Sequence, residues 1–214
     1  MMLNDVMFND KSASIDWNIV LTKKVIPLPN IKTAMVDIKG ADGILDLSEA
    51  LTGDVVYTNR DIKLTFSMMD VTDCPALISK ISNYIHGKKI KVSFSEDNEY
   101  YYVGRAYIDQ YECSNNVGVI VIGMSAEPYK YYQNETVYIS TVNGSKSIVL
   151  NNDRMIVSPT LTVSGTIKMT FEGKEYQLSE GEQQVLNFTL KEGDNFVTFS
   201  GDGVVKITYR KGRL

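Results

Sequence analysis

The sequence predicts a mainly β protein with two domains, a β-rich N-terminal domain that contains one short α-helix and a C-terminal β-sandwich. Tyrosine, valine, isoleucine and threonine, which favour strands, are abundant, and 13 of the 214 residues are tyrosine. A single segment has the apolar spacing of a good amphipathic helix. In the C-terminal part, strand-like segments and turn signals alternate about every 8 to 12 residues.

The first 30 residues are expected to form an extended arm, in which residues 17–20 can start a strand. Pro27 and Pro29 exclude a helix at its end. Residues 31–39 then alternate like a strand, and a turn is predicted at residues 40–43. Residues 55–68 give one long strand, or two strands with a bend.

The helix is predicted over "TDCPALISKISNYIHG", residues 72–87. Thr72 or Asp73 can cap its start, Pro75 suits the first turn, and Gly87 ends it. Its apolar side chains recur at i, i+1, i+4, i+7 and i+8, which places them on one stripe: Leu77, Ile78, Ile81, Tyr84 and Ile85.

Strands follow the helix at residues 89–94 and 100–113, as a hairpin. The segment "VIVIGM" at 119–124 is apolar on both faces, so both faces must be covered. Two explanations stay open, the middle of a sandwich and a subunit interface.

The polar, proline-containing segment "SAEPYKYYQNE" predicts the domain boundary, with domains at residues 1–131 and 132–214. Beyond it, eight short strands are expected, among them "TVYIS", "KSIVL", "DNFVTFSG" and "GVVKITYR". No low-complexity linker separates the two parts, so they are expected to pack together.

The net charge of −4 does not suggest a nucleic-acid-binding protein. Up to Tyr131 there are 13 Lys and Arg against 17 Asp and Glu, and after it 9 of each, so the excess acid lies in the first part. The N-terminus lacks the pattern of a signal peptide, and no segment has the length of a membrane span. Cys74 and Cys113 have no metal spacing; free thiols are favoured over a disulfide.

The stretch "VDIKGADGILDLSE" at residues 36–49 contains acids and glycines that could suggest a binding loop. The acids do not fall at the alternate positions of a calcium loop, and the lysine of a phosphate loop is missing. Asp42-Gly43 is a strong turn dipeptide. We therefore expect a turn, with no metal and no cofactor.

Catalytic residues are scarce. The only histidine, His86, lies at the helix end, where it can complement the helix dipole, and a Ser-His-Asp site built on it has no further support. We expect no enzyme activity. The tyrosines of "EYYYVG" and "PYKYY" fit strand packing or, alternatively, a sugar-binding platform. Arg60 and Arg105 fit either a buried or interface ion pair or an exposed position.

Taken in order, several motifs resemble the siphophage distal tail protein family. They are "GADGILD" (40–46), "YTNRDI" (57–62), the helix at 75–86, "YYYVGRAYI" (100–108), "EPYKYY" (127–132) and the end "VKITYRKGRL". The match spans nearly the whole chain. Ala41 departs from it, because the family often has arginine there, which puts any ionic contact at that position in doubt.

The resemblance implies a structural protein of a phage, prophage or phage-like tail. The N-terminal belt domain would form a hexameric ring, and the C-terminal domain would be a galectin-like β-sandwich. Partners would be the tail tube protein, the tail-tip or baseplate hub protein and the tape-measure protein, in a virion tail assembled in the bacterial cytoplasm. DNA would pass through the lumen of the ring, and an acidic wall would not bind the DNA. The alternative function is a carbohydrate-binding module for host recognition.

The same resemblance marks candidate subunit contacts in the ring domain. These are Gly40, Asp42, Gly43, Tyr57, Arg60, Tyr102, Arg105, Pro128 and Tyr129.

Overall fold

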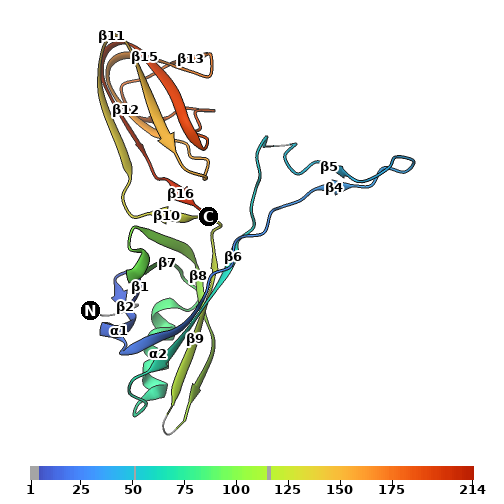
Figure 1. Cartoon of the computed structure of the whole chain (residues 1–214). Helices are drawn as coiled ribbons and strands as arrows, with labels where there is room; N and C mark the ends of the chain where they lie inside the picture. Colours follow the sequence, from blue (N-terminus) through green and yellow to red (C-terminus); the bar gives the residue numbers. More distant parts are fainter. Residues whose placement is uncertain (1–4, 51, 115–116) are drawn as a thin grey trace. The chain divides into compact units, whose positions relative to one another are not determined.

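A computed structural model describes residues 5–50, 52–114 and 117–214 of the chain. It divides into two compact units, one that ends at Lys130 and one that begins at Tyr131. Strands dominate both units, which confirms the mainly β fold (Figure 1). Among the described residues, no helix has the length and apolar character needed to cross a membrane.

The first unit is built on one antiparallel sheet with the strand order β2-β1-β7-β8-β9-β6-β3. A small separate ladder, β4 with β5, lies outside it. The strands are β1 (Val6–Phe8), β2 (Lys11–Ser12), β3 (Ile19–Val25), β4 (Met35–Val36), β5 (Leu45–Asp46), β6 (Arg60–Met68), β7 (Lys89–Phe94), β8 (Tyr100–Cys113) and β9 (Gly118–Ala126). A short 3-10 turn, η1 (Ser95–Asp97), joins β7 to β8.

Helix α2 (Cys74–Ile85) packs on one face of this sheet (Figure 1). Pro75 lies in its first turn, as expected, because a proline there removes no hydrogen bond of the helix. Ile78, Ile81 and Ile85 are buried and share one core with the inward side chains of β6 and β9. The predicted apolar stripe is therefore the face that holds the helix on the sheet.

The prediction of an extended arm over the first 30 residues is wrong for residues 5–16, which form β1, β2 and the short helix α1 (Ala13–Asp16). The strand expected to start at residues 17–20 is present as β3, which begins at Ile19. Ser12 caps α1, since its Oγ accepts the Ile15 N–H at 2.9 Å. Phe8 and Trp17 are buried with their ring centroids 5.2 Å apart, so apolar burial draws this segment into the core.

The preference for free thiols is also wrong, because Cys74 and Cys113 form a disulfide. Their Cα atoms lie 6.2 Å apart, within the range that a disulfide spans. Cys74 begins α2 and Cys113 ends β8, so the bond ties the start of the helix to the sheet. The compartment argument missed this because it takes no account of where the fold places the two side chains.

Strand β9, which carries "VIVIGM", pairs with β8 on one side and β6 on the other. Ile120 and Ile122 face the core that α2 covers, and both are almost fully buried. Val121 on the opposite face is 7% exposed, although it belongs to a single sheet with the helix on the other side. Within the described residues β9 therefore lies at the centre of a single sheet and not in the middle of a sandwich, and the subunit-interface explanation for its second face stays a prediction.

The second unit is one five-stranded antiparallel sheet with the order β11-β15-β12-β13, and β14 also pairs with β12. Its strands are β11 (Thr136–Asn152), β12 (Thr160–Phe171), β13 (Lys174–Gln177), β14 (Gly181–Gln184) and β15 (Gly193–Tyr209). Two short strands, β10 (Lys130–Tyr132) and β16 (Gly212–Arg213), lie before and after it in the sequence.

A row of glycines crosses the three long strands of this sheet. Gly144 of β11 pairs with Gly201 of β15, and Gly165 of β12 pairs with Gly203 of β15. All four have positive φ, from 79° to 156°, which glycine adopts with little strain. The inward side chains on both sides of the row belong to one core.

The sheet therefore bends at the glycines, and its two halves face each other across a shared core. The sequence predicted separate short strands here, such as "TVYIS" and "KSIVL", where the structure has one 17-residue strand, β11. Glycine within a run is a turn signal in the sequence, but here it bends a strand without ending it.

Candidate functional site

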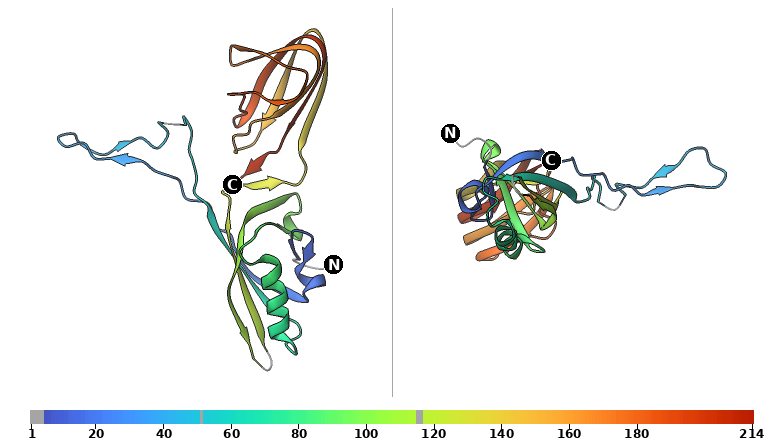
Figure 2. Two further views of the ribbon diagram at one scale, coloured as in Figure 1. Left: turned by 180° about the vertical axis from the view of Figure 1, so that it is seen from behind. Right: turned by 90° about the horizontal axis from the view of Figure 1, so that it is seen from below.

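The most distinctive feature of the first unit is a long two-stranded excursion between β3 and β6, which we call the arm (residues 26–50 and 52–59). Its strands meet first at Ile31 and Tyr57, and the N–H of Lys32 donates to Val56 O at 2.8 Å. Farther out, β4 pairs with β5, and the N–H of Ala41 closes the tip on Ile38 O at 3.1 Å. Figures 1 and 2 show β4 and β5 side by side in the arm, beyond the end of β6.

The arm exposes apolar side chains along its whole length. Every residue from 30 to 47 is exposed, and Ile44 is 66% exposed. Eight large apolar side chains are involved: Leu28, Ile31, Met35, Val36, Ile38, Ile44, Leu45 and Leu47. An exposed apolar surface of this extent is typical of an interface, because covering it removes apolar area from water.

Gly40, Asp42 and Gly43 lie at the tip of the arm. The two glycines have φ values of 88° and 79°, and a Cβ on either one would meet no atom within 4 Å. The predicted turn is therefore present, and backbone conformation rather than close packing accounts for these glycines. A subunit contact through these three residues stays a prediction.

Arg60 lies at the root of the arm, at the first position of β6, and its side chain is buried. Its Nη2 donates to the Pro128 carbonyl, and its guanidinium lies 5.5 Å from the centroid of the Tyr102 ring. Nε has no hydrogen-bond partner. Burial lowers the pKa of Arg60 and raises the pKa of Tyr102, because each side chain is removed from water.

A second contact, this one between two aromatic rings, also joins the root of the arm to the segment after β9. The rings of Tyr57 and Tyr129 meet edge to face, with their centroids 5.9 Å apart. Together with the Arg60 contacts, it joins the end of the arm to the segment after β9. Five candidate residues, distant in sequence, are thus brought together at the root: Tyr57, Arg60, Tyr102, Pro128 and Tyr129.

Arg105 is not part of this root cluster. It is exposed on β8, opposite Lys89 of β7, and its Nη1 donates to the Gly87 carbonyl. Arg105 therefore fits the exposed alternative. Arg60 is buried, but its contacts are a carbonyl and an aromatic ring, and no ion pair of Arg60 is present among the described residues.

The tyrosines of "EYYYVG" do not form an open sugar-binding platform. Tyr100, Tyr101 and Tyr102 are 8%, 6% and 7% exposed. A cation lies over each ring: Lys130 over Tyr100 at 4.2 Å, Lys91 over Tyr101 at 4.8 Å, and Arg60 over Tyr102. Cation–π contact and burial account for these rings.

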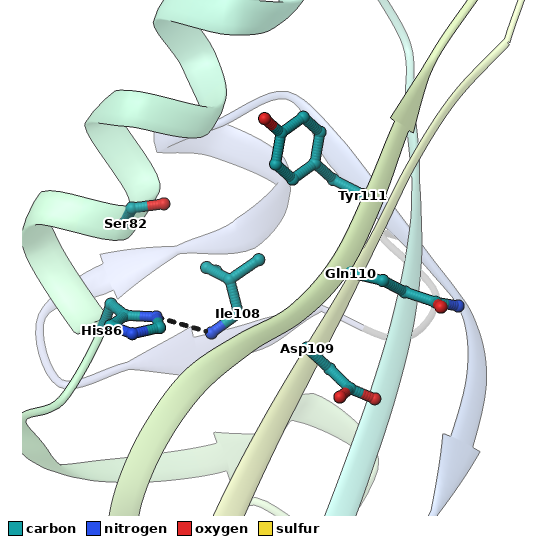
Figure 3. Close-up of a pocket in the computed structure, with 6 residues that line it drawn as sticks. All are labelled: Ser82, His86, Ile108, Asp109, Gln110 and Tyr111. Carbon is teal, nitrogen blue, oxygen red and sulfur yellow. Dashed lines mark hydrogen bonds between the residues drawn. The ribbon is translucent and has the colours of Figure 1, made fainter.

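The surroundings of His86 do not support a Ser-His-Asp site. Ser82, His86 and Asp109 line one pocket between α2 and β8 (Figure 3). The Nδ1 of His86, which would have to face the carboxylate, accepts the Ile108 N–H at 3.0 Å. Asp109 points away from His86 and pairs with Lys63 at 3.0 Å. His86 therefore covers a backbone N–H of β8, a role that its position in the sequence did not suggest.

No group of three or more His, Cys, Asp or Glu side chains is placed to hold a metal ion within residues 5–50, 52–114 and 117–214.

Comparison with known proteins gives a structural match without a sequence match. No family model and no curated protein match the sequence. The fold is similar to the crystal structure of the Dit protein of phage SPP1, described as a paradigm of the hub adsorption apparatus in phages that infect Gram-positive hosts. The TM-score is 0.71 at 13% sequence identity, over 97% of this chain and 99% of that one. The chain therefore has the fold of a siphophage distal tail protein, as its motifs suggested.

Proposed function

We propose that this chain is a structural hub protein of a phage tail. It would form a hexameric ring in the virion tail and would be assembled in the bacterial host cytoplasm. One side of the ring would join the tail tube, the other the tail-tip or baseplate hub protein, and the tape-measure protein would be a further partner. The observation that carries this proposal is the fold match, which spans both chains almost from end to end.

The arm supports a ring. Its apolar side chains lie on both strands and are not covered by any of the described residues, so another molecule is the natural cover for them. Six identical copies, each with its arm on the next, would cover every arm and close without a free end. The root cluster at Arg60 would fix the direction in which the arm leaves the sheet.

The two units would then have different roles. The first unit, residues up to Lys130, would form the belt of the ring, and the second, from Tyr131, would be its galectin-like sandwich. The excess of acidic residues in the first unit suits a lumen through which DNA passes, because acidic walls do not retain a polyanion.

Electron microscopy of the purified full-length protein tests the proposal. We expect six-fold rings with an open centre. Particles without a ring, for the chain alone and for the chain mixed with a tail tube protein and a tail-tip protein, would contradict it.

Neither alternative function is proposed. The tyrosines of "EYYYVG" are buried under cations, and the Nδ1 of His86 is occupied by a backbone N–H.

A further inference from the structure

Strand β11 is an open edge of the second unit. It stands at the end of the strand order and pairs with β15 along all of its 17 residues. An edge strand presents a row of backbone N–H and C=O groups that can pair with another strand. In Figure 1, β11 lies at the outside of the bent sheet, beside β15.

The other edge strands of the described residues carry features that discourage such pairing. β2 has two residues and contains Lys11, and β3 contains Lys23 and Lys24 and has a bulge between Leu21 and Lys23. β13 contains Lys174 and Glu175, and β14 contains Glu182. Charges, bulges and short length are the usual protections of a sheet edge.

The first half of β11 has none of these protections. From Thr136 to Ser145 it contains no charge and no proline, and the only charged residue of the whole strand is Lys146. Val137, Tyr138 and Ile139 are consecutive and are 49%, 42% and 68% exposed. An uncharged run of this kind on a long edge strand is a site of strand addition.

We propose that the first half of β11 pairs antiparallel with the β11 of a second copy of this chain. The segment is self-complementary, since pairing about Ile139 sets Ile139 against Ile139 and Val137 against Thr141. No charges meet in this arrangement, because Lys146 falls opposite residue 132, which lies outside β11. A partner strand that carries charges is disfavoured, because the first half of β11 offers no opposite charge to pair with them.

The periodicity of the strand fixes which residues can face each other. Val137, Ile139 and Thr141 alternate with Ser140 and Val142, which are buried. A two-fold axis perpendicular to the sheet keeps the odd-numbered side chains of both copies on the outer face. On this face the two Ile139 side chains would adjoin each other, with Lys206 of β15 beside each of them and Val204 beside Thr141.

Disulfide trapping tests this pairing in the full-length protein. Directly opposed residues of an antiparallel pair have Cα atoms about 4.5–5.5 Å apart, which a disulfide can span. The native cysteines are bonded to each other, so a new cysteine would be the free thiol. We expect Ile139→Cys to give a covalent dimer on mild oxidation, and a mixture of Val137→Cys and Thr141→Cys to give the mixed dimer.

Phe196→Cys is the matched control. Phe196 is 70% exposed but lies on β15, which β11 and β12 flank. If Ile139→Cys gives no covalent dimer, the proposal is overturned. It is also overturned if Phe196→Cys cross-links equally well, because random collision or non-specific association would then explain the dimer.

A charge exchange gives a second, independent test. Ile139→Lys should abolish the dimer because two lysines would face each other, whereas a mixture of Ile139→Lys and Ile139→Glu should restore it. Phe196→Lys should leave it unchanged. A dimer that survives Ile139→Lys, or that the mixture fails to restore, contradicts the pairing. The inference does not depend on the proposed ring. When polar residues replace the apolar side chains of the arm in the Ile139→Cys variant, the covalent dimer should still form.

Discussion

Arg60 is 3% exposed, yet it meets a backbone carbonyl and an aromatic ring. A buried guanidinium is stabilised only when its donors are used and its charge lies against favourable electron density. The Pro128 carbonyl accepts from one donor of Arg60 and the Tyr102 ring faces its charge, whereas Nε has no hydrogen-bond partner among the described residues. Arg60 therefore joins the start of β6 to the segment after β9, at the point where the arm leaves the sheet.

Replacing Arg60 should destabilise the first unit. Arg60→Ala removes the packing on Tyr102 and leaves the Pro128 carbonyl without this donor, which should lower the free energy of unfolding by about 2–4 kcal/mol. Arg105→Ala is the control, because Arg105 is exposed, and it should change stability by less than about 1 kcal/mol. Urea unfolding followed by fluorescence measures both, and equal effects would show that the root cluster carries no special stability.

At the residue scale, the sequence grouped residues through motifs but did not predict the contacts that they make within the chain. Arg60, Tyr102 and Pro128 were selected through a motif, and an ion pair was one reading of Arg60. Its partners are 42 and 68 positions away, so only the strand register could identify them. The contact of His86 with Ile108 depends in the same way on where β8 runs beside α2.

The glycine row of the second unit determines the shape of three strands at once. A Cβ on Gly201 would lie 2.1 Å from the Thr166 carbonyl oxygen, and one on Gly203 would lie 2.1 Å from Ser164 O. The neighbouring backbone therefore occupies the space of a side chain, and the positive φ adds a second restriction. Without these glycines, the two halves of the sheet could not face one core.

Gly201→Ala should cost about 3 kcal/mol or more, because the methyl group meets backbone atoms that cannot move independently. Gly173→Ala is the matched control, since Gly173 also has positive φ (75°) but has no atom within 4 Å of the added Cβ. It should cost about 1–2 kcal/mol from the backbone conformation alone. Thermal unfolding of both variants compares the two costs, and similar losses would rule out the close approach as the cause.

The disulfide between α2 and β8 closes a loop with a sequence separation of 39 residues. By loop entropy alone, such a cross-link stabilises by about 4 kcal/mol. Cys113→Ala should remove this stabilisation without a packing cost, because Cys113 is exposed. Urea unfolding should show the loss, and a reductant should lower the wild type to the same level. If the variant is as stable as the oxidised wild type, the disulfide does not contribute to the free energy of unfolding.

At the element scale, periodicity predicted what depends on local sequence and missed what depends on tertiary contacts. The stripe of α2 and the hairpin of β7 and β8 were read from spacing alone. Residues 5–16 were misjudged because β1, β2 and α1 are each only two to four residues long, too short for a pattern. The long bent strands were divided because glycine has the same sequence signal in a turn and in a bend.

For the whole molecule, the arm is the feature that needs a partner. Its eight exposed apolar side chains are costly in water and have no role in the core of their own unit. The sequence analysis placed an extended arm in residues 1–30 instead. Pro27 and Pro29 lie at the start of the arm in the structure, but the prolines do not indicate whether the extended segment precedes or follows them. The proposed hexameric hub therefore has one consequence that can be measured: the arms must hold the copies together.

Native mass spectrometry of the full-length chain tests this most directly, with a variant in which Val36, Ile38, Ile44 and Leu45 are all replaced by serine. These side chains are exposed, so the variant should keep the circular dichroism spectrum of the unchanged chain. We predict six copies, or a multiple of six where rings are joined through β11, for the unchanged chain, and one copy, or the pair joined through β11, for the variant. An unchanged chain that never reaches six copies, or a six-copy ring that survives in the variant, would contradict the account.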